Sequence, residues 1–277
     1  MALPKVVSGE EWLAARKELL AKEKELTRRR DALNAERRRL PMVEVTKTYT
    51  FDRPGGPVTL AELFGDRLQL IVQHIMFGPD WDAACPVCTT FMNELSQPIL
   101  DRLADRQTAY VLVSRAPLAK LQAYQAQMGW SLPWYSSHGS DFNYDFQVTV
   151  DPSAGQPTHN YRPAPDLPDG QRSTEKDGIS CFLRDGGRVF HTYSAYARGL
   201  DHTDLPYAYL DLTALGRQES WEEPRDRAPI LRWLAAAGGQ RRISATPWAT
   251  AQGAQIGMLV PRSCRVMMAR PSHTPWS

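Results

Sequence analysis

Two cysteines separated by two residues, Cys85 and Cys88, are the side chains of this chain best suited to covalent chemistry. They follow an apolar run, residues 68–77, that is typical of a strand, and they precede residues 89–95, which read as the start of a helix. A C-x-x-C pair at a strand-to-helix junction is typical of a redox dithiol. The spacing therefore predicts a pair that closes into a disulfide and reopens, passing electrons.

The two sulfurs are expected to differ in role. Cys85 lies at the mouth of the predicted helix, where unpaired N–H groups and the helix dipole favour a thiolate, so it is the expected nucleophile. Cys88 lies one turn further in and is the expected resolving thiol. Pro86 fits the first helical turn, where its fixed φ is favourable. Asp80 and Asp82 act in the opposite direction, since nearby carboxylates would raise the pKa of Cys85.

Two other interpretations of the pair stay open. The cysteines could be buried small residues, or they could hold zinc. A structural zinc site needs four ligands, commonly from a second closely spaced pair. Cys181, Cys264 and the six histidines show no such pairing. The sequence therefore predicts neither a metal nor a cofactor.

Further side chains could tune the dithiol or bind its substrate. His74 lies on the strand that leads to the cysteines and could relay a proton, although an ordinary strand histidine fits the position as well. Arg115 follows the next strand, at the edge where sites gather in α/β sheets, and could stabilise a thiolate; a surface ion pair is the alternative. An aromatic pocket, or equally a lid packed on the sheet, is predicted from Trp81, Trp130, Trp134, Phe142 and Tyr144.

The elements around the dithiol alternate between strand and helix. Pro98 should break the helix after the cysteines, and Gly129 should end the next one. Asp185-Gly186-Gly187 predicts a hairpin turn. We expect strands at 43–51, 68–77, 109–114, 179–184 and 188–193, and helical segments at 60–64, from about 86, at 117–128 and at 205–215, with a long loop at 151–178. This pattern favours a central mixed sheet flanked by helices, with the dithiol at the tip of a parallel strand: a thioredoxin-like α/β fold.

A charged helix is expected ahead of this domain, over residues 8–40. Ser8 and Glu11 form a capping box, and Pro41 should stop the helix. Leucines recur every seven residues, but a coiled coil needs two apolar positions per heptad, and the second one here is mostly occupied by charged residues. The stripe is too narrow for a two-stranded coil, so we expect the helix to pack against its own domain or a partner.

The composition divides the chain into three parts: 1–41, an N-terminal charged helix; 42–226, the thioredoxin-like domain; and 227–277, an Arg/Ala/Pro-rich tail. The 51 residues of the tail contain no Asp, Glu, Lys, Asn, Phe or Tyr but seven Arg. This departure predicts either a disordered extension or a shifted reading frame from about residue 224.

Composition also bounds location and partners. A net charge of +2 does not suggest nucleic-acid binding, and neither a signal-peptide core nor an apolar stretch long enough to span a bilayer is present. The chain is therefore expected to be cytoplasmic, without a membrane or nucleic-acid partner. A thiol or disulfide substrate and an unidentified electron donor are the expected partners, and a homodimer is compatible with the sequence.

Several strings resemble an uncharacterised bacterial thioredoxin-like family, a domain of unknown function often labelled a predicted dithiol-disulfide isomerase. They recur in order over roughly residues 5–226, and include MFGPDW at 76–81, VSRAPLAK at 113–120 and SHGSDFNYDF at 137–146. The resemblance implies a thioredoxin fold and thiol–disulfide chemistry. One feature departs from thioredoxins: Gly178, rather than their cis-proline, precedes the strand expected to face the cysteines.

A weaker resemblance concerns peroxiredoxins. Residues 79–86 are similar to their Pro-x-x-x-Thr-x-x-Cys segment, but Asp82 occupies the threonine position that normally hydrogen-bonds peroxide. The function predicted is a thiol–disulfide oxidoreductase. The alternatives are a peroxiredoxin-like peroxidase and a non-enzymatic thioredoxin-like binding module.

Overall fold

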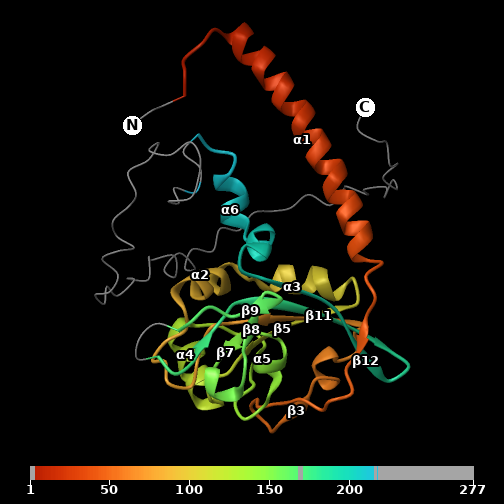
Figure 1. The fold of residues 1–277 in the computed structure, drawn as a ribbon, viewed down its shortest axis with the longest axis vertical. Helices are drawn as coiled ribbons and strands as arrows, with labels where there is room; N and C mark the ends of the chain where they lie inside the picture. Colours follow the sequence, from red (N-terminus) through yellow and green to blue (C-terminus); the bar gives the residue numbers. More distant parts are fainter. Residues whose placement is uncertain (1–3, 168–170, 215–216, 218–277) are drawn as a thin grey trace, which may run out of the picture. The chain divides into compact units, whose positions relative to one another are not determined.

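A six-stranded mixed sheet lies at the centre of the computed structural model, which describes residues 4–167, 171–214 and 217 (Figure 1). The strand order is β1-β12-β11-β4-β5-β6. β4, β5 and β6 run parallel, whereas β11, β12 and β1 each pair antiparallel to their neighbour. The strands are β1 (Val43–Glu44), β4 (Gln69–His74), β5 (Thr108–Ser114), β6 (Trp134–Ser136), β11 (Gly178–Asp185) and β12 (Arg188–Tyr196). This arrangement is a thioredoxin-like fold, as predicted.

Helices connect the parallel strands. α2 (Pro86–Glu94) and α3 (Gln97–Ala104) join β4 to β5 and lie along one side of the sheet (Figure 1), and α4 (Leu118–Met128) joins β5 to β6. The predicted break before Pro98 is confirmed, since α2 ends before a new N-cap at Ser96. Gly129 ends α4 in the left-handed conformation, with φ 71°, which glycine adopts without a Cβ penalty.

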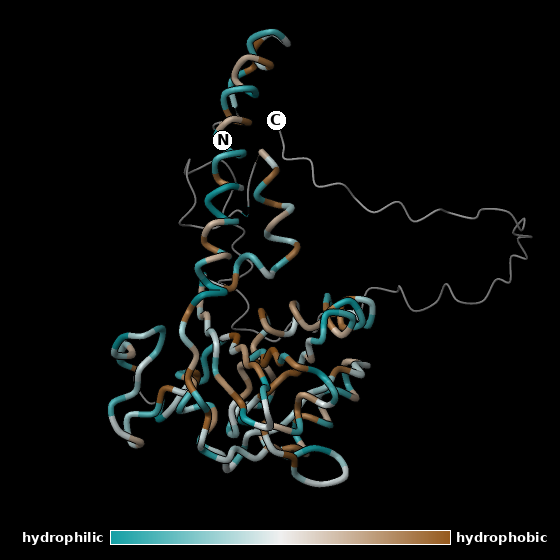
Figure 2. Tube along the Cα trace, turned by 90° about the vertical axis from the view of Figure 1, so that its right-hand side faces the viewer, coloured by the Kyte–Doolittle hydropathy of each residue, from teal (hydrophilic) through white to brown (hydrophobic). Residues whose placement is uncertain are grey.

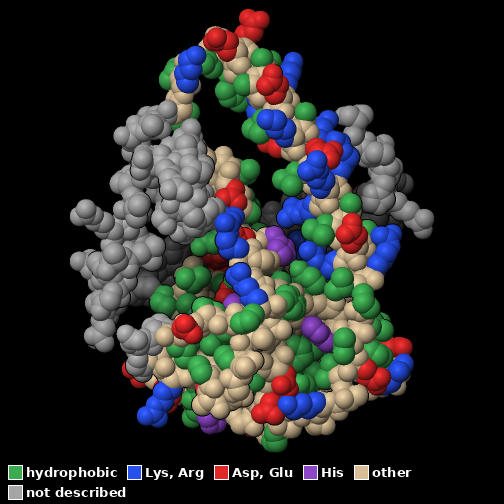
Figure 3. Space-filling view, in the orientation of Figure 1, with side chains coloured by type: hydrophobic (Ala, Val, Ile, Leu, Met, Phe, Trp, Pro, Cys, Tyr) green, Lys and Arg blue, Asp and Glu red, His purple; other side chains and the backbone are tan. Residues whose placement is uncertain are grey.

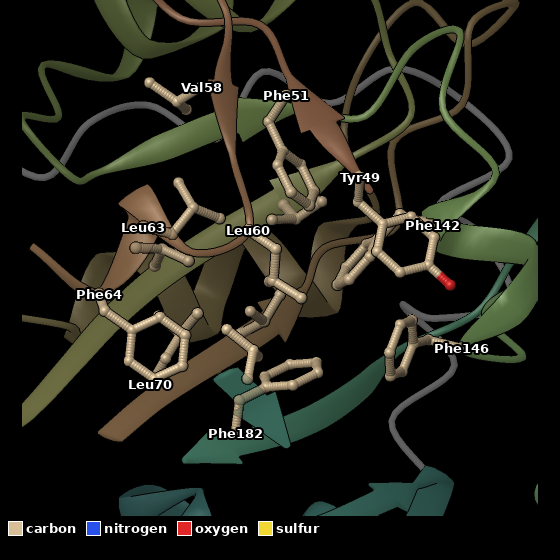
Figure 4. Packing of buried hydrophobic residues seen from close by; sticks show 14 residues of the cluster. Tyr49, Phe51, Val58, Leu60, Leu63, Phe64, Leu70, Phe142, Phe146 and Phe182 are labelled. Carbon is tan, nitrogen blue, oxygen red and sulfur yellow. The ribbon is translucent and has the colours of Figure 1, made fainter. Parts of the chain in front are cut away.

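Two hydrophobic clusters fill the two faces of the sheet. One contains Ile75, directly after β4, and Cys88, Met92, Leu112 and Leu121 from α2, β5 and α4. The other lies under the hairpin of β2 (Thr50–Phe51) and β3 (Val58–Thr59), the 3-10 helix η1 (Glu62–Phe64) and α5 (Phe142–Asp145). Its rings and aliphatic side chains pack against one another in Figure 4. Figure 2 shows hydrophobic residues concentrated in the strands of the central sheet. Both faces are thus covered, as expected for parallel strands.

The predicted hairpin is confirmed as β11–β12. Its two-residue loop, Gly186 and Gly187, has φ of 55° and 80°, which is the geometry that two-residue hairpins require. The 3-10 helix η3 (Ala197–Thr203) and α6 (Leu205–Leu210) follow β12. The predicted loop at 151–178 contains η2 (Pro152–Ala154) and short strand pairs. Those small strands are β8 (Thr158–His159), β9 (Arg162–Pro163) and β10 (Thr174–Glu175), and β10 pairs with β7 (Thr149–Val150), which lies just before the loop.

One predicted strand was wrong, and one strand was missed. Residues 43–51 do not form one strand: β1 joins the central sheet, whereas β2 (Thr50–Phe51) pairs with β3 (Val58–Thr59). Strand β6 was missed; it lies within the aromatic segment that was predicted either to line a pocket or to pack as a lid on the sheet. Three residues directly after Pro133 are too short to show a period of two, and their pairing with β5 is decided by tertiary packing.

The N-terminal helix α1 (Gly9–Arg37) carries the predicted capping box between Ser8 and Glu11. It ends before Pro41, because residues 38–40 form a turn. Basic and acidic side chains follow one another along α1 in Figure 3, and none of its residues is buried. The predicted tail at 227–277 lies outside the described residues. Among the residues that are described, no helix combines the length and hydrophobicity needed to cross a membrane.

Candidate active site

Cys85 is the N-cap residue of α2, with Pro86 at the first helical position. The backbone fixes it on both sides: its N–H donates to the carbonyl oxygen of Met76 at 2.9 Å, and its own carbonyl accepts from the Thr89 N–H at 2.9 Å. Met76 lies two residues after the end of β4, so the sulfur is placed at the carboxyl end of a central parallel strand. Cys85 is half-buried and Cys88 is buried, as their positions in α2 dictate.

The environment separates the two thiols. The pKa of Cys85 is lowered to about 6, chiefly by the hydrogen bond from the Cys88 thiol and also by the N–H groups of Cys88 and Val87, which face its sulfur without forming a full capping bond. Burial opposes this shift. The pKa of Cys88 is raised by the same thiol pair, by burial and by the negative charge of Cys85. Cys85 therefore carries the thiolate, and Cys88 keeps its proton.

A carboxylate that the sequence did not single out acts on both sulfurs. The charge of Asp177 raises the pKa of Cys85 and of Cys88, and Asp177 lines the same cavity as Cys88. It directly precedes β11, which pairs with the strand leading to the cysteines. The sequence offered one signal for Asp177: it directly precedes the strand that was expected to face the cysteines. Asp80 and Asp82 are exposed on the loop before Cys85, and an effect of Asp82 on the thiol stays a prediction.

The loop that leads into the dithiol is held by α4. The Lys120 Nζ donates to the carbonyl oxygens of Pro79 and Trp81, at 2.6 and 3.0 Å. Gly78 lets this loop close tightly, because a Cβ there would meet the Trp81 ring at 3.1 Å. Lys120 thus positions the loop next to Cys85, a role that is invisible without the tertiary structure.

The structure does not bring His74 to the dithiol. Its ring stacks on Phe142 and Phe146, with centroids 5.6 and 6.4 Å apart, on the face of the sheet opposite the Cys88 cluster. The His74 Nε2 is 2.9 Å from the Ser180 hydroxyl, and burial lowers its pKa to about 3. Because side chains alternate along a strand, Gln73 and Ile75 face Cys88 instead. His74 is a neutral core residue.

Arg115 is also engaged elsewhere. Its Nε donates to the Glu175 carboxylate at 2.7 Å, and its two terminal nitrogens donate to Tyr144 and Ser173. Glu175 is almost fully buried and accepts further hydrogen bonds from Thr149 and Asn143. This network ties β10 and α5 to the end of β5. The sequence left open a thiolate-stabilising role or a surface ion pair for Arg115. In the structure Arg115 forms an ion pair with Glu175, and this pair is buried.

The aromatic residues do not form one pocket. Trp81, Trp130 and Trp134 pack with the Cys88 cluster, and the indole N–H of Trp134 donates to Ser114. Phe142 lies in the opposite cluster, and Tyr144 accepts from Arg115. The predicted set is therefore split between two faces of the sheet, and the alternative, packing on the sheet, describes it better. No group of three or more His, Cys, Asp or Glu side chains within the described residues could hold a metal ion.

Comparison with solved structures returns peroxiredoxins at low similarity. A peroxiredoxin Q from Xanthomonas campestris is 14% identical, with a TM-score of 0.40 over 63% of this chain and 98% of that one. Peroxidoxin BcpB from Mycobacterium tuberculosis is 16% identical, with a TM-score of 0.40 over 60% and 92%. A PrxQ mutant from Xylella fastidiosa is 10% identical, with a TM-score of 0.39 over 59% and 91%. These values are too low to transfer an activity.

No curated protein matches this sequence. One family model does, over residues 1–237, which takes in the N-terminal helix and the sheet domain and extends past residue 226. The chain belongs to this family, described as bacterial protein of unknown function (DUF899).

Proposed function

We propose that Cys85 and Cys88 form a dithiol–disulfide couple that exchanges electrons with thiol or disulfide substrates. The observation that carries this proposal is the opposite shift of the two pKa values within a C-x-x-C at a helix N-terminus. A thiolate that forms near neutral pH, next to a buried thiol that stays protonated, supports an attacking and a resolving cysteine.

The exchange balances in two steps. The Cys85 thiolate attacks a substrate disulfide, forms a mixed disulfide and expels one substrate thiolate. Cys88 then loses its proton and attacks the Cys85 sulfur, which forms the Cys85–Cys88 disulfide and releases the second substrate thiolate. A dithiol donor returns two electrons to the pair. The reverse sequence would oxidise a substrate dithiol.

Trapping tests this proposal. A Cys88→Ser variant should accumulate mixed disulfides through Cys85 that dithiothreitol releases, while a Cys85→Ser variant should not. The proposal fails if Cys88→Ser captures nothing and Cys85 resists alkylation. Peroxide-dependent sulfenic acid at Cys85, formed faster than on free cysteine, would point to a peroxidase instead. Unchanged function of a double serine variant would point to a binding module.

A further inference from the structure

An apolar cavity of about 380 Å³ lies against the face of the sheet next to α2 and α3. Its wall combines side chains of both layers: Ile71 and Ile179 from the sheet, and Leu95, Ile99 and Leu103 from the helical segment opposite. A volume of this size is within the range of sites for small organic molecules. The lining favours a ligand with an apolar body.

Two charged side chains, Arg37 and Glu94, line this cavity; burial and the charge of Asp204 raise the pKa of Glu94, which favours its neutral form. Arg37, the last residue of α1, lines it, with its guanidinium over the Tyr193 ring at 4.8 Å. Within the part of the chain that the structure describes, no carboxylate pairs with Arg37. Its charge reaches into the cavity, because it lowers the pKa of Cys181, another lining residue, against the effect of burial. A guanidinium over an aromatic ring at an apolar cavity favours a ligand carboxylate.

Another cavity adjoins the first on the side of the dithiol. This second cavity, of about 300 Å³, shares Phe91, Leu200 and Thr203 with the first and is lined by Cys88. The carboxylates of Asp177 and Asp204 also line it, together with the ion pair of Arg198 and Asp201, so its lining carries a net negative charge. Since these charges disfavour an anion, a ligand carboxylate is directed to the Arg37 end, and an uncharged chain is directed toward Cys88.

We propose that this cavity binds a linear aliphatic carboxylic acid, with its carboxylate on Arg37 and its chain between the sheet and α3. The site does not depend on thiol–disulfide exchange, because no step of binding involves a sulfur. Decanoate is a suitable probe, and 1-decanol is its uncharged counterpart.

Calorimetric titration of the full chain tests the head group. Wild type should bind decanoate saturably, and Arg37→Met should weaken decanoate binding about tenfold, as the loss of a charge-assisted pair predicts, while leaving 1-decanol binding unchanged. Arg38→Met is the matched control, since Arg38 is the next residue of the chain and is exposed. It should leave the affinities for decanoate and 1-decanol unchanged. Equal decanoate binding to wild type and Arg37→Met, or no saturable binding, overturns the proposal.

Cys181 reports the location independently. In a Cys85→Ser/Cys88→Ser/Cys264→Ser background, saturating decanoate should slow maleimide labelling of Cys181 several-fold. A Leu103→Trp substitution, which fills the cavity from α3, should abolish both the protection and the binding of decanoate and 1-decanol, with an unchanged circular dichroism spectrum. Undiminished labelling in the presence of bound decanoate overturns the assigned site. Since this background lacks the dithiol, either result leaves the proposed exchange function untouched.

Discussion

At the scale of single residues, the active site rests on a difference between two chemically identical side chains. Cys85 receives hydrogen bonds at its sulfur, whereas Cys88 provides one and is enclosed by apolar neighbours. The first arrangement stabilises a thiolate and the second a thiol. Asp177 works against the thiolate, so the couple is less acidic than α2 alone would make it.

This balance gives a pH prediction for Cys85. In a Cys181→Ser/Cys264→Ser background, the rate of iodoacetamide alkylation of Cys85 should rise with pH with a midpoint of about 6, below the value of about 8.5 for a free cysteine. Asp177→Asn should move the midpoint lower, because it removes a negative charge near the thiolate. Cys88→Ala should move it higher, because it removes the main hydrogen-bond donor. The midpoints are read from rates followed by mass spectrometry.

Asp82→Asn serves as the comparison, because Asp82 is an exposed carboxylate on the loop before Cys85. A midpoint that moves with Asp82→Asn and stays fixed with Asp177→Asn would contradict the assignment of Asp177.

At the scale of elements, β11 approaches its neighbours closely at its first residue. A Cβ on Gly178 would lie 2.9 Å from the Tyr196 ring on β12 and 3.0 Å from Val148. A larger residue at position 178 would therefore clash with Tyr196 and Val148 unless these side chains moved. This gives a packing reason for glycine where thioredoxins have proline.

Gly178→Ala should therefore destabilise the fold by about 1–3 kcal/mol, the usual cost of overpacking. Urea unfolding measures the loss. Gly199→Ala is the matched control, because its Cβ would make only an ordinary contact of 3.5 Å with Ala195. Equal stability of the two variants would show that Tyr196 moves aside without cost.

The Arg115–Glu175 pair gives a second prediction at this scale. Arg115→Met leaves a buried carboxylate without its cation and should cost about 3–5 kcal/mol at pH 7. Burial already raises the pKa of Glu175, and loss of Arg115 should raise it further, so the cost should shrink as the pH falls and the carboxyl is protonated. Denaturant titrations at pH 5 and pH 7 measure both values.

The double variant Arg115→Met/Glu175→Gln separates charge from packing. It should recover part of the stability lost in Arg115→Met, because no unpaired charge is left. If the double variant is as unstable as the single one at both pH values, the network acts through shape rather than charge.

At the scale of the whole chain, we propose that residues 1–41, 42–226 and 227–277 are separate parts, although the family model extends to residue 237. The N-terminal helix contributes no buried residue. Its leucines at 19, 26 and 33 are exposed. At its end Arg37 contacts the sheet domain through the Tyr193 ring, whereas packing of the leucine stripe, against the domain or a partner, stays a prediction.

Deletion of residues 1–36 should accordingly leave the thermal midpoint of the sheet domain within about 2 °C of the full chain, since little apolar area is lost from the core. Differential scanning calorimetry, with tryptophan fluorescence as a second probe, measures the transition. A large fall in the midpoint would mean that α1 stabilises the domain in solution, directly or through a second copy.

The local features of this protein follow from its sequence. The C-x-x-C after an apolar strand, the glycine turn of the β11–β12 hairpin and the end of α4 at Gly129 depend on neighbouring residues and on φ preferences, so they were predictable. The tertiary structure alone decided which strand face His74 occupies, since alternation defines two faces without saying which one α2 covers. Long-range packing likewise decided that Glu175 pairs with Arg115 and that Asp177 acts on the dithiol, because these contacts join segments far apart in the chain.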